Sequence, residues 1–239
     1  CTIGIGIPGA ISPASGLVKN ANSVWLNGKP LQHDLERLIG QPLRFSNDAN
    51  CFALSEAADG AAAGASVVFG VIVGTGTGGG IVAHGRVLEG PHRIAGEWGH
   101  NPLPWPKPEE WPGPPCYCGH TGCIETFLAG PALARAYELQ TGEIVDATEV
   151  ARRAGQNEPT ATEVLASYEH QMARALAGVI NVLDPDVIVL GGGLSNIDRL
   201  YTNVPRLWTP FVFSDHVDTP LVRAAHGDSS GARGAAWLW

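Results

Sequence analysis

Two continuous apolar runs, each followed by glycines, constrain the fold of this chain most strongly. The first covers residues 67–73, and the second covers residues 186–190 within DPDVIVLGGG. Uninterrupted apolar runs of this length are typical of buried strands that are covered on both faces. Segments with helical spacing surround them, at residues 31–39, 49–63, 124–140, 148–154 and 162–183. This alternation predicts an α/β fold with mostly parallel central strands.

Shorter elements complete this prediction. We expect short strands at residues 2–7, 43–45 and 221–225, and a closing helix at residues 231–239. The glycine-rich segment 74–80 connects the first apolar run to a short strand at residues 81–83. This arrangement predicts a hairpin. It differs from the Rossmann and P-loop patterns, in which a helix follows the glycines.

Length and charge exclude several classes of protein. A chain of 239 residues can bury a substantial core as one large domain or two small ones. The net charge is −8, which argues against a large nucleic-acid interface because such interfaces need clustered Lys and Arg. No apolar run reaches the roughly 18 residues that span a bilayer. We therefore expect neither a nucleic-acid partner nor a membrane.

Three of the five cysteines lie within eight residues, in CYCGHTGC. Together with His100, the thiols of Cys116, Cys118 and Cys123 form a closed tetrahedral set of the kind that zinc prefers. The alternative is that these are small buried apolar side chains beside an unrelated histidine. A full set of protein ligands predicts a structural zinc, with the second imidazole nitrogen of His100 free to contact a ligand. Cys1 and Cys51 are then free thiols, as is usual in a reducing cytoplasm.

Two acidic residues flank this cluster, Glu97 on one side and Glu125 on the other. They are either ordinary surface acids or members of a binding site. Two carboxylates and an imidazole that converge in one pocket are suitable partners for neighbouring hydroxyl groups. The placement of both acids beside a metal cluster favours a sugar site.

Three further segments each allow a structural and a functional interpretation. Asn47 and Asp48 end a predicted strand, where they either cap the next helix or supply a general base at the sheet edge. The segment 74–80 is either a flexible hairpin or a phosphate cradle of backbone N–H groups. The glycines at 191–193 are either a tight turn or a flat surface for a nucleotide base. The residues alone leave these alternatives open.

Several motifs together resemble the ROK family of sugar kinases and sugar-responsive repressors. They are GEWGH, CYCGHTGCIETF and NDAN, with VGTGTGGG and DPDVIVLGGG similar to the family's ATP-contacting segments. Within the family, the chain resembles the bacterial fructokinases most closely, through GIPGAISPASGLVKNANSVWLNG and HGDSSGARGAAWLW. The resemblance extends over the whole chain.

The resemblance implies an actin-like (ribonuclease H-like) α/β fold with two domains and a hexose in the cleft between them. Residues 1–47 would be the remainder of a small N-terminal domain. Residues 48–239 would form the large domain, which carries the zinc loop and a last helix that returns to the small domain. The implied activity is ATP-dependent phosphorylation of fructose to fructose 6-phosphate, with Asp48 as the general base.

The resemblance also assigns the remaining site residues. Hexose contacts are implied for Asn47, Glu97, His100 and Glu125, and further sugar contacts for Gly9 and Asn22. ATP contacts are implied for Gly74, Thr75, Gly76, Thr77, Gly192 and Gly193. The implied cofactors are a structural Zn²⁺ at His100, Cys116, Cys118 and Cys123, and Mg²⁺ with ATP. A homodimer in the cytoplasm is also expected.

Other members of the family give alternative functions. The chain is alternatively the sugar-sensing domain of a repressor, or a glucokinase or N-acetylhexosamine kinase. Asp48 and the GTGTGGG loop favour a kinase. Family kinases begin with a DxGxT loop for ATP phosphates, which nothing in this sequence matches. We therefore expect that a front part is absent and that residues 1–239 alone phosphorylate sugar poorly. The segment WPKPEEWPGPP is a second departure, and we expect it to project from the zinc site.

Overall fold

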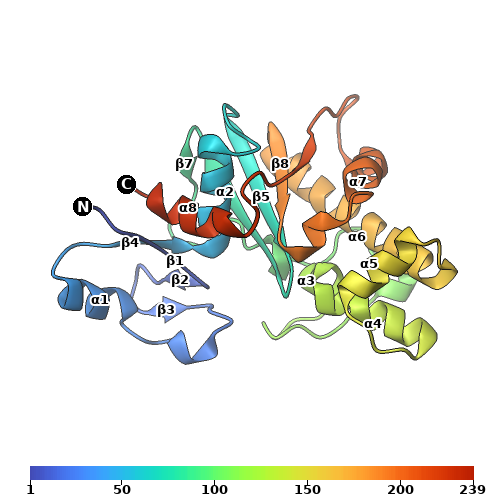
Figure 1. The fold of residues 1–239 in the computed structure, drawn as a ribbon, viewed down its shortest axis with the longest axis horizontal. Coiled ribbons are helices and arrows are strands. Elements are labelled where there is room, and N and C mark those ends of the chain that lie inside the picture. The colour runs from blue at the N-terminus through green and yellow to red at the C-terminus, as the bar shows by residue number, and fades with distance from the viewer.

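The computed structural model describes residues 1–239, apart from the side chain of Asp228. Its largest sheet has five strands in the order β7-β6-β5-β8-β9. The strands β5 (Val67–Val73), β8 (Val187–Gly191) and β9 (Leu221–Arg223) are parallel, while β6 (Thr77–Ala83) pairs antiparallel with β5, and β7 (Arg86–Val87) pairs antiparallel with β6. The two predicted apolar runs are therefore adjacent parallel strands at the centre of the molecule (Figure 1).

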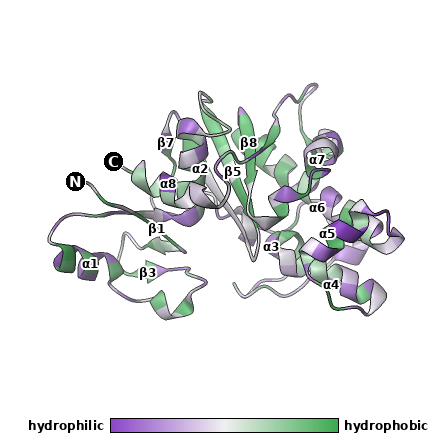
Figure 2. Ribbon diagram, in the orientation of Figure 1, coloured by the Kyte–Doolittle hydropathy of each residue, from purple (hydrophilic) through white to green (hydrophobic). Residues whose placement is uncertain are grey.

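Helices cover both faces of this sheet, as the apolar runs predict. On one face, α2 (Asp48–Asp59) packs on alternate strand residues such as Val68 and Val189. The other face, with Val71 and Leu190, packs against a group of helices: α3 (Glu125–Leu128), α4 (Gly130–Thr141), α5 (Ala147–Gly155), α6 (Pro159–Leu183) and α7 (Leu200–Trp208). The central strands are accordingly the most uniformly hydrophobic part of Figure 2.

The N-terminal elements form their own small core beside the sheet. Strand β1 (Gly4–Ile7) pairs in parallel with β4 (Arg44–Asn47), and β2 (Ala10–Ile11) pairs antiparallel with β3 (Val18–Lys19). Helix α1 (Leu31–Ile39) covers them, and Ile7, Val18 and Phe45 are among the buried residues. The short 3₁₀ helices of the chain are η1 (Val24–Leu26), η2 (Trp98–His100), η3 (Pro108–Glu110), η4 (Gly193–Asn196), η5 (Thr209–Phe211) and η6 (Gly227–Ser229).

The last helix, α8 (Ser230–Ala236), joins the two parts (Figure 1). It packs between β1 and α2 at distances that only glycine allows. A Cβ on Gly4 would lie 1.8 Å from the Ala235 carbonyl oxygen, and a Cβ on Gly234 would lie 1.6 Å from that of Cys51. The chain ends therefore lie side by side, and the Trp239 indole donates to the Ile3 carbonyl at 2.9 Å.

The glycines at 78–80 were predicted to be part of a loop, but they belong to strand β6. The reason is tertiary: a Cβ on Gly80 would lie 2.4 Å from the Ala49 carbonyl oxygen, and a Cβ on Gly79 would lie 2.8 Å from the Trp98 ring. Glycine thus allows the start of α2 to lie directly on the sheet. Only Gly74, Thr75 and Gly76 form the hairpin turn.

The predicted helix at residues 124–140 is two helices, because Ala129 is extended. This break lets the Gly130 N–H donate to the Gly74 carbonyl at 2.7 Å, which ties α4 to the hairpin. Helix α2 ends at Asp59 and α8 at Ala236, several residues before the predicted ends. Among the described residues, none of the helices has the length and apolar character needed to cross a membrane.

Candidate functional site

Asn47 and Asp48 share the two roles that the sequence left open. Asn47 is the N-cap of α2, since its Oδ1 accepts from the Ala49 N–H at 2.8 Å. Its amide donates to the Gly9 carbonyl at 3.1 Å, which joins β4 to the turn after β1. Asp48 is the first helical residue, and its Oδ1 accepts from the same Ala49 N–H at 2.9 Å. Because Asn47 performs the capping, the exposed Asp48 carboxylate is available to the space in front of it.

That space is a cleft of about 160 Å³ between the N-terminal elements and the sheet. Asp48 lines it, together with all six residues predicted to contact a hexose: Gly9, Asn22, Asn47, Glu97, His100 and Glu125. The hairpin residues 74–77 form its other wall. The structure therefore brings together residues that are up to 116 positions apart in the sequence.

Glu125 is positioned by the hairpin. It begins α3, and its Oε2 accepts from the Thr77 N–H at 2.9 Å. A Cβ on Gly76 would lie only 2.7 Å from that oxygen, so glycine is needed where the carboxylate passes. Within the turn itself, the Gly74 N–H donates to the Gly76 carbonyl at 3.0 Å. Of the four hairpin residues predicted to contact ATP, Thr75 is the exposed one, while Thr77 is buried.

Glu97 and His100 lie at the two ends of the short helix η2, which Trp98 anchors to the sheet. The Trp98 indole donates to the Gly78 carbonyl at 3.0 Å, and its ring packs edge-on against Phe69 at 5.5 Å. A buried aromatic residue thus fixes both polar side chains relative to β6.

The four predicted metal ligands converge. One ligand atom from each of His100, Cys116, Cys118 and Cys123 lies within 4.8 Å of the others. Cys118 Sγ and Cys123 Sγ are 3.6 Å apart, as are Cys116 Sγ and His100 Nδ1. Ligands about 2.3 Å from a zinc ion at the centre of a tetrahedron are separated by about 3.8 Å, so the donor set fits zinc in both chemistry and spacing.

The imidazole of His100 links this cluster to the cleft. Its Nδ1 faces the thiols. Its Nε2, which was predicted to be free for a ligand, is instead 2.9 Å from the Tyr117 hydroxyl. The backbone around Cys123 is equally tied down: the Leu103 N–H donates to the Gly122 carbonyl, and the Ile124 N–H donates to Asn101. Because Glu125 follows two residues after Cys123, the cluster fixes the start of α3 as well.

Two carboxylates of the cleft have perturbed pKa values. Burial among protein atoms raises the pKa of Asp48, although its carboxylate is open to the cleft, and the Ala49 N–H opposes this shift. Burial also raises the pKa of Glu97, opposed by His100 and Lys19 and reinforced by the negative charges of Asp48 and Glu125. Carboxyl groups with raised pKa values in a cleft are characteristic of acid–base sites.

A second pocket of about 420 Å³ begins on the other side of the hairpin. Its walls come from the hairpin turn, the N-terminal ends of α4 and α5, and the glycines after β8: Gly74, Thr75, Gly130, Pro131, Ala134, Asp146, Ala147, Thr148, Gly193 and Leu194. Gly192 shapes the turn before it, with φ of 82° and a Cβ position only 2.4 Å from the Val73 carbonyl oxygen. Gly74 and Thr75 line both pockets, so the two spaces meet at the hairpin.

Sequence reasoning missed several residues that line these spaces. Tyr117 and Asn20 line the cleft, and Gly130 and Asp146 line the second pocket. An exposed aromatic residue between two metal ligands was an available signal for Tyr117. The Gly130-Pro131 pair was an available signal for a helix start.

The Pro/Trp-rich segment does not project from the zinc site, as the sequence predicted. It folds back onto α6, where Glu110 forms a buried two-point ion pair with Arg174, at 2.6 and 2.7 Å. Arg174 also donates to the Trp105 carbonyl at 2.5 Å. An arginine on α6 thus has its charge satisfied by this segment, which explains why the segment packs rather than extends.

Comparison with known proteins gives consistent matches along the whole chain. The sequence model of the ROK family matches residues 1–239. An N-acetyl-D-glucosamine kinase from Vibrio cholerae is 40% identical over 241 residues, which cover 99% of this chain and 80% of the relative. The sequence motifs predicted that the chain is most similar to bacterial fructokinases, and these matches do not support that prediction.

Solved structures agree with this assignment. The ROK hexokinase from Thermus thermophilus is 33% identical with a TM-score of 0.86, and the match covers 99% of this chain and 77% of that one. A ROK family glucokinase from Streptomyces griseus, in complex with glucose and AMPPNP, is 26% identical with a TM-score of 0.83, covering 99% and 80% of the two chains. The predicted actin-like α/β fold is thereby confirmed.

Proposed function

Because the chain belongs to the ROK family, we propose that it transfers the γ-phosphoryl group of ATP to a hexose, with an N-acetylated hexosamine as the preferred acceptor. One observation carries this proposal: the cleft of Asp48 and the second pocket meet at Gly74 and Thr75. Phosphoryl transfer depends mainly on placing the acceptor hydroxyl and the terminal phosphate next to each other. A hexose in the cleft and a nucleotide in the second pocket satisfy that requirement.

Asp48 is the general base in this proposal. Its carboxylate takes the proton of the attacking hydroxyl as the new P–O bond forms and ADP leaves. The raised pKa of Asp48 makes it a better proton acceptor than an ordinary aspartate. Asn47, Glu97, His100 and Glu125 bind the other hydroxyl groups and orient the sugar. Mg²⁺ enters as part of the ATP substrate.

The zinc cluster has a positioning role. His100, Cys116, Cys118 and Cys123 would hold the ion, whose closed ligand set leaves no position for a substrate. When bound, the zinc fixes geometry and supplies no acid–base chemistry. In this chain the ion would fix the ring of His100 through Nδ1 and, through Cys123, the position of Glu125 at the start of α3.

The choice of sugar rests on similarity. Fructose was the first expectation from sequence motifs, and an N-acetylhexosamine was one of the alternatives. The 40% identity to an N-acetyl-D-glucosamine kinase supports the alternative. We propose N-acetyl-D-glucosamine ahead of glucose, and glucose ahead of fructose.

We also propose that residues 1–47 and residues 48–239 behave as two domains. The separate apolar core of the N-terminal elements supports this division, as does a cleft lined from both sides. Helix α8 would then be the connection on which closure occurs, since it packs against β1 and α2 together. The homodimer and the cytoplasmic location stay predictions.

A substrate panel tests the proposed reaction. The protein is assayed for ADP release with N-acetyl-D-glucosamine, N-acetyl-D-mannosamine, glucose and fructose, with a sugar-free control. We expect sugar-dependent ADP release, a hexose phosphate in the ³¹P NMR spectrum, and the highest kcat/KM with N-acetyl-D-glucosamine. Sugar binding by calorimetry without any turnover would contradict the kinase and support the repressor alternative.

A further inference from the structure

A recess adjoins the hexose cleft. Asp48 does not line it, and it is separate from the nucleotide pocket. It has a volume of about 720 Å³. Five residues line both spaces: Asn20, Asn22, Glu97, His100 and Tyr117. Asp48 and the hairpin line the cleft but are not among the lining residues of the recess. The recess therefore opens from the end of the cleft that is remote from the base.

The outer walls of this recess are partly apolar, with Cys118 and His120 of the zinc loop on the remaining side. Val24 in η1 and Ile94 in the loop before η2 contribute their side chains, although these are 70% and 48% exposed in the structure. The wall at Ala21 offers no free backbone group, because Asn27 accepts from its N–H at 2.9 Å and donates to its carbonyl at 3.0 Å. Exposed aliphatic groups on the wall of a binding site indicate a ligand with an apolar portion.

The two walls come from different parts of the chain and are held together. Val24 belongs to the N-terminal elements, and Ile94 belongs to the loop between β7 and η2. The Lys19 ammonium donates to the His92 carbonyl at 2.6 Å, which joins the N-terminal elements to the loop that carries Ile94. The recess is consequently a defined space, and its width does not depend on the exposed side chains alone.

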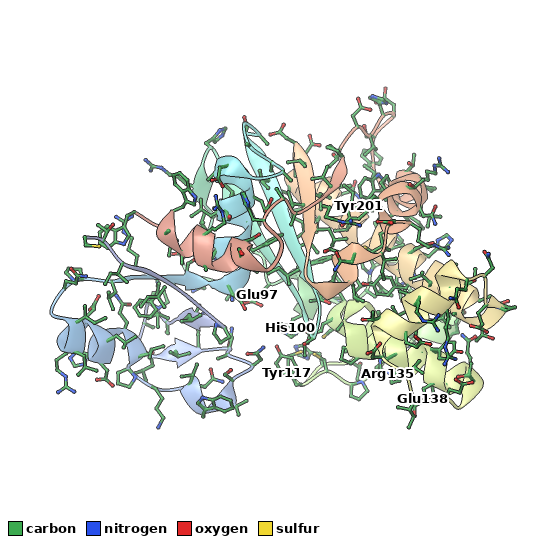
Figure 3. The ribbon with its side chains drawn as sticks, viewed as in Figure 1. Glu97, His100, Tyr117, Arg135, Glu138 and Tyr201 are labelled. Carbon is green, nitrogen blue, oxygen red and sulfur yellow. The ribbon has the colours of Figure 1, made fainter. Side chains whose placement is uncertain are left out.

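Tyr117 lies at the border between recess and cleft. Its hydroxyl contacts His100 Nε2 at 2.9 Å, and the two rings meet edge-on with centroids 5.1 Å apart. Figure 3 shows Glu97, His100 and Tyr117 grouped where the N-terminal elements face the zinc loop. A tyrosine combines an apolar ring with a polar tip, so it is suited to a group that has both an amide and a methyl.

We propose that this recess receives the acetamido substituent of an N-acetylated hexose and that Tyr117 and Ile94 determine the preference for it. The inference rests on the proposed kinase function. If the hydroxyl on carbon 6 faces Asp48, carbons 1 and 2 lie at the opposite end of the ring, next to the recess. The acetyl methyl then contacts Val24 and Ile94, while the amide lies beside Glu97 and Tyr117. A sugar with a hydroxyl group on carbon 2 has no acetyl methyl, so Val24 and Ile94 stay exposed to water when it binds.

Selectivity between two sugars tests the proposal. The ratio of kcat/KM for N-acetyl-D-glucosamine to that for glucose is measured in the wild type and in Tyr117→Ala, Ile94→Asp and Val24→Asp. Loss of a buried methyl contact and part of an aromatic face predicts a drop in this ratio of about tenfold in each variant. The matched control is Trp111→Ala, an aromatic residue of similar exposure that lies outside the recess. We expect it to leave the ratio unchanged.

Zinc content is measured in parallel, because Tyr117 lies between two metal ligands. Full zinc content with an unchanged ratio in Tyr117→Ala would overturn the role of Tyr117. If that variant loses zinc, the two aspartate variants decide, since neither Ile94 nor Val24 is a metal ligand or lies next to one in the sequence. Unchanged ratios in both would overturn the recess as the acetamido site. Absence of turnover with every sugar in the wild type would instead contradict the proposed function.

The size of the recess gives a second test. A closely fitted pocket discriminates against one extra methylene by about 10–200-fold. The recess has room beyond an acetyl group, so we expect N-propionyl-D-glucosamine to retain a kcat/KM within about threefold of N-acetyl-D-glucosamine. A loss of tenfold or more would place the acetamido group elsewhere.

Discussion

The hexose end and the nucleotide end of the site are built from different parts of the chain. At the hexose end, the side chains of Asp48, Glu97 and Glu125 point into the cleft, held by helix caps, a buried tryptophan and a metal cluster. At the nucleotide end, most of the lining residues are small, with glycines at 74, 130 and 193. The hexose end is therefore sensitive to the loss of a functional group. The nucleotide end is sensitive to the addition of atoms.

The largest expected effect is at Asp48. Asp48→Asn keeps the shape of the side chain but removes the proton acceptor, so kcat is expected to fall by roughly 10²–10⁴-fold while the dissociation constant for the hexose changes little. Steady-state kinetics and calorimetry measure the two quantities. Asp34→Asn is a matched control, because Asp34 also lies in the first turn of a helix but outside the cleft. Wild-type kcat in Asp48→Asn would remove Asp48 from the mechanism.

The metal cluster should be the next most sensitive part. Cys118→Ser replaces a thiolate ligand, and the loss in zinc affinity should exceed the roughly 10–100-fold that follows from losing a mere supporting partner of a ligand. Zinc content and the thermal unfolding midpoint should both decrease, because metal binding contributes to folding. Cys1→Ser, which changes an exposed thiol outside the cluster, is the control. One zinc per chain in Cys118→Ser would contradict the ligand assignment.

Gly76→Ala tests whether the hairpin positions Glu125. The new methyl would lie 2.7 Å from Glu125 Oε2, so the carboxylate has to move and give up its bond from the Thr77 N–H. Hydrogen bonds to charged groups contribute about 1.5–3 kcal/mol, which corresponds to a rise in the hexose KM of roughly tenfold or more. Gly155→Ala, whose methyl meets no atom within 4 Å, is the control. An unchanged hexose KM in Gly76→Ala would separate Glu125 from sugar binding.

The pH dependence should show the smallest effect. The pKa of Asp48 is raised above its ordinary value of 3.8 by burial, and a base must be ionised to act. Activity therefore falls as the pH is lowered through this raised pKa, earlier than for an exposed aspartate. The acid limb of kcat/KM against pH measures it. An acid limb at or below pH 3.8 would show that burial does not perturb this carboxylate.

Features that depend on local sequence were predictable, and features that depend on tertiary contacts were not. The thiols lie within eight residues, so their spacing alone identified them as a cluster. Asn47 and Asp48 were recognisable as the end of a strand, but the residues alone left both of their roles open. By contrast, the glycines at 78–80 looked like a loop, because nothing near them in sequence shows that α2 lies on β6. The break before Gly130 depends on a hydrogen bond to Gly74, 56 positions earlier. The recess at Tyr117 combines walls from Val24 and Ile94, which no spacing rule connects.

The most direct test of the contrast between the two ends is a pair of Michaelis constants measured in two variants. Glu97→Gln removes a charge at the hexose end, and Gly193→Ala adds a methyl to the nucleotide pocket at a position where it meets no other atom within 4 Å. We predict that Glu97→Gln raises the KM for the hexose by about tenfold or more and leaves the KM for ATP within about twofold. Gly193→Ala should show the reverse pattern. If both variants raise the same constant, the division of the site into a hexose end of acidic side chains and a nucleotide end of small residues is wrong.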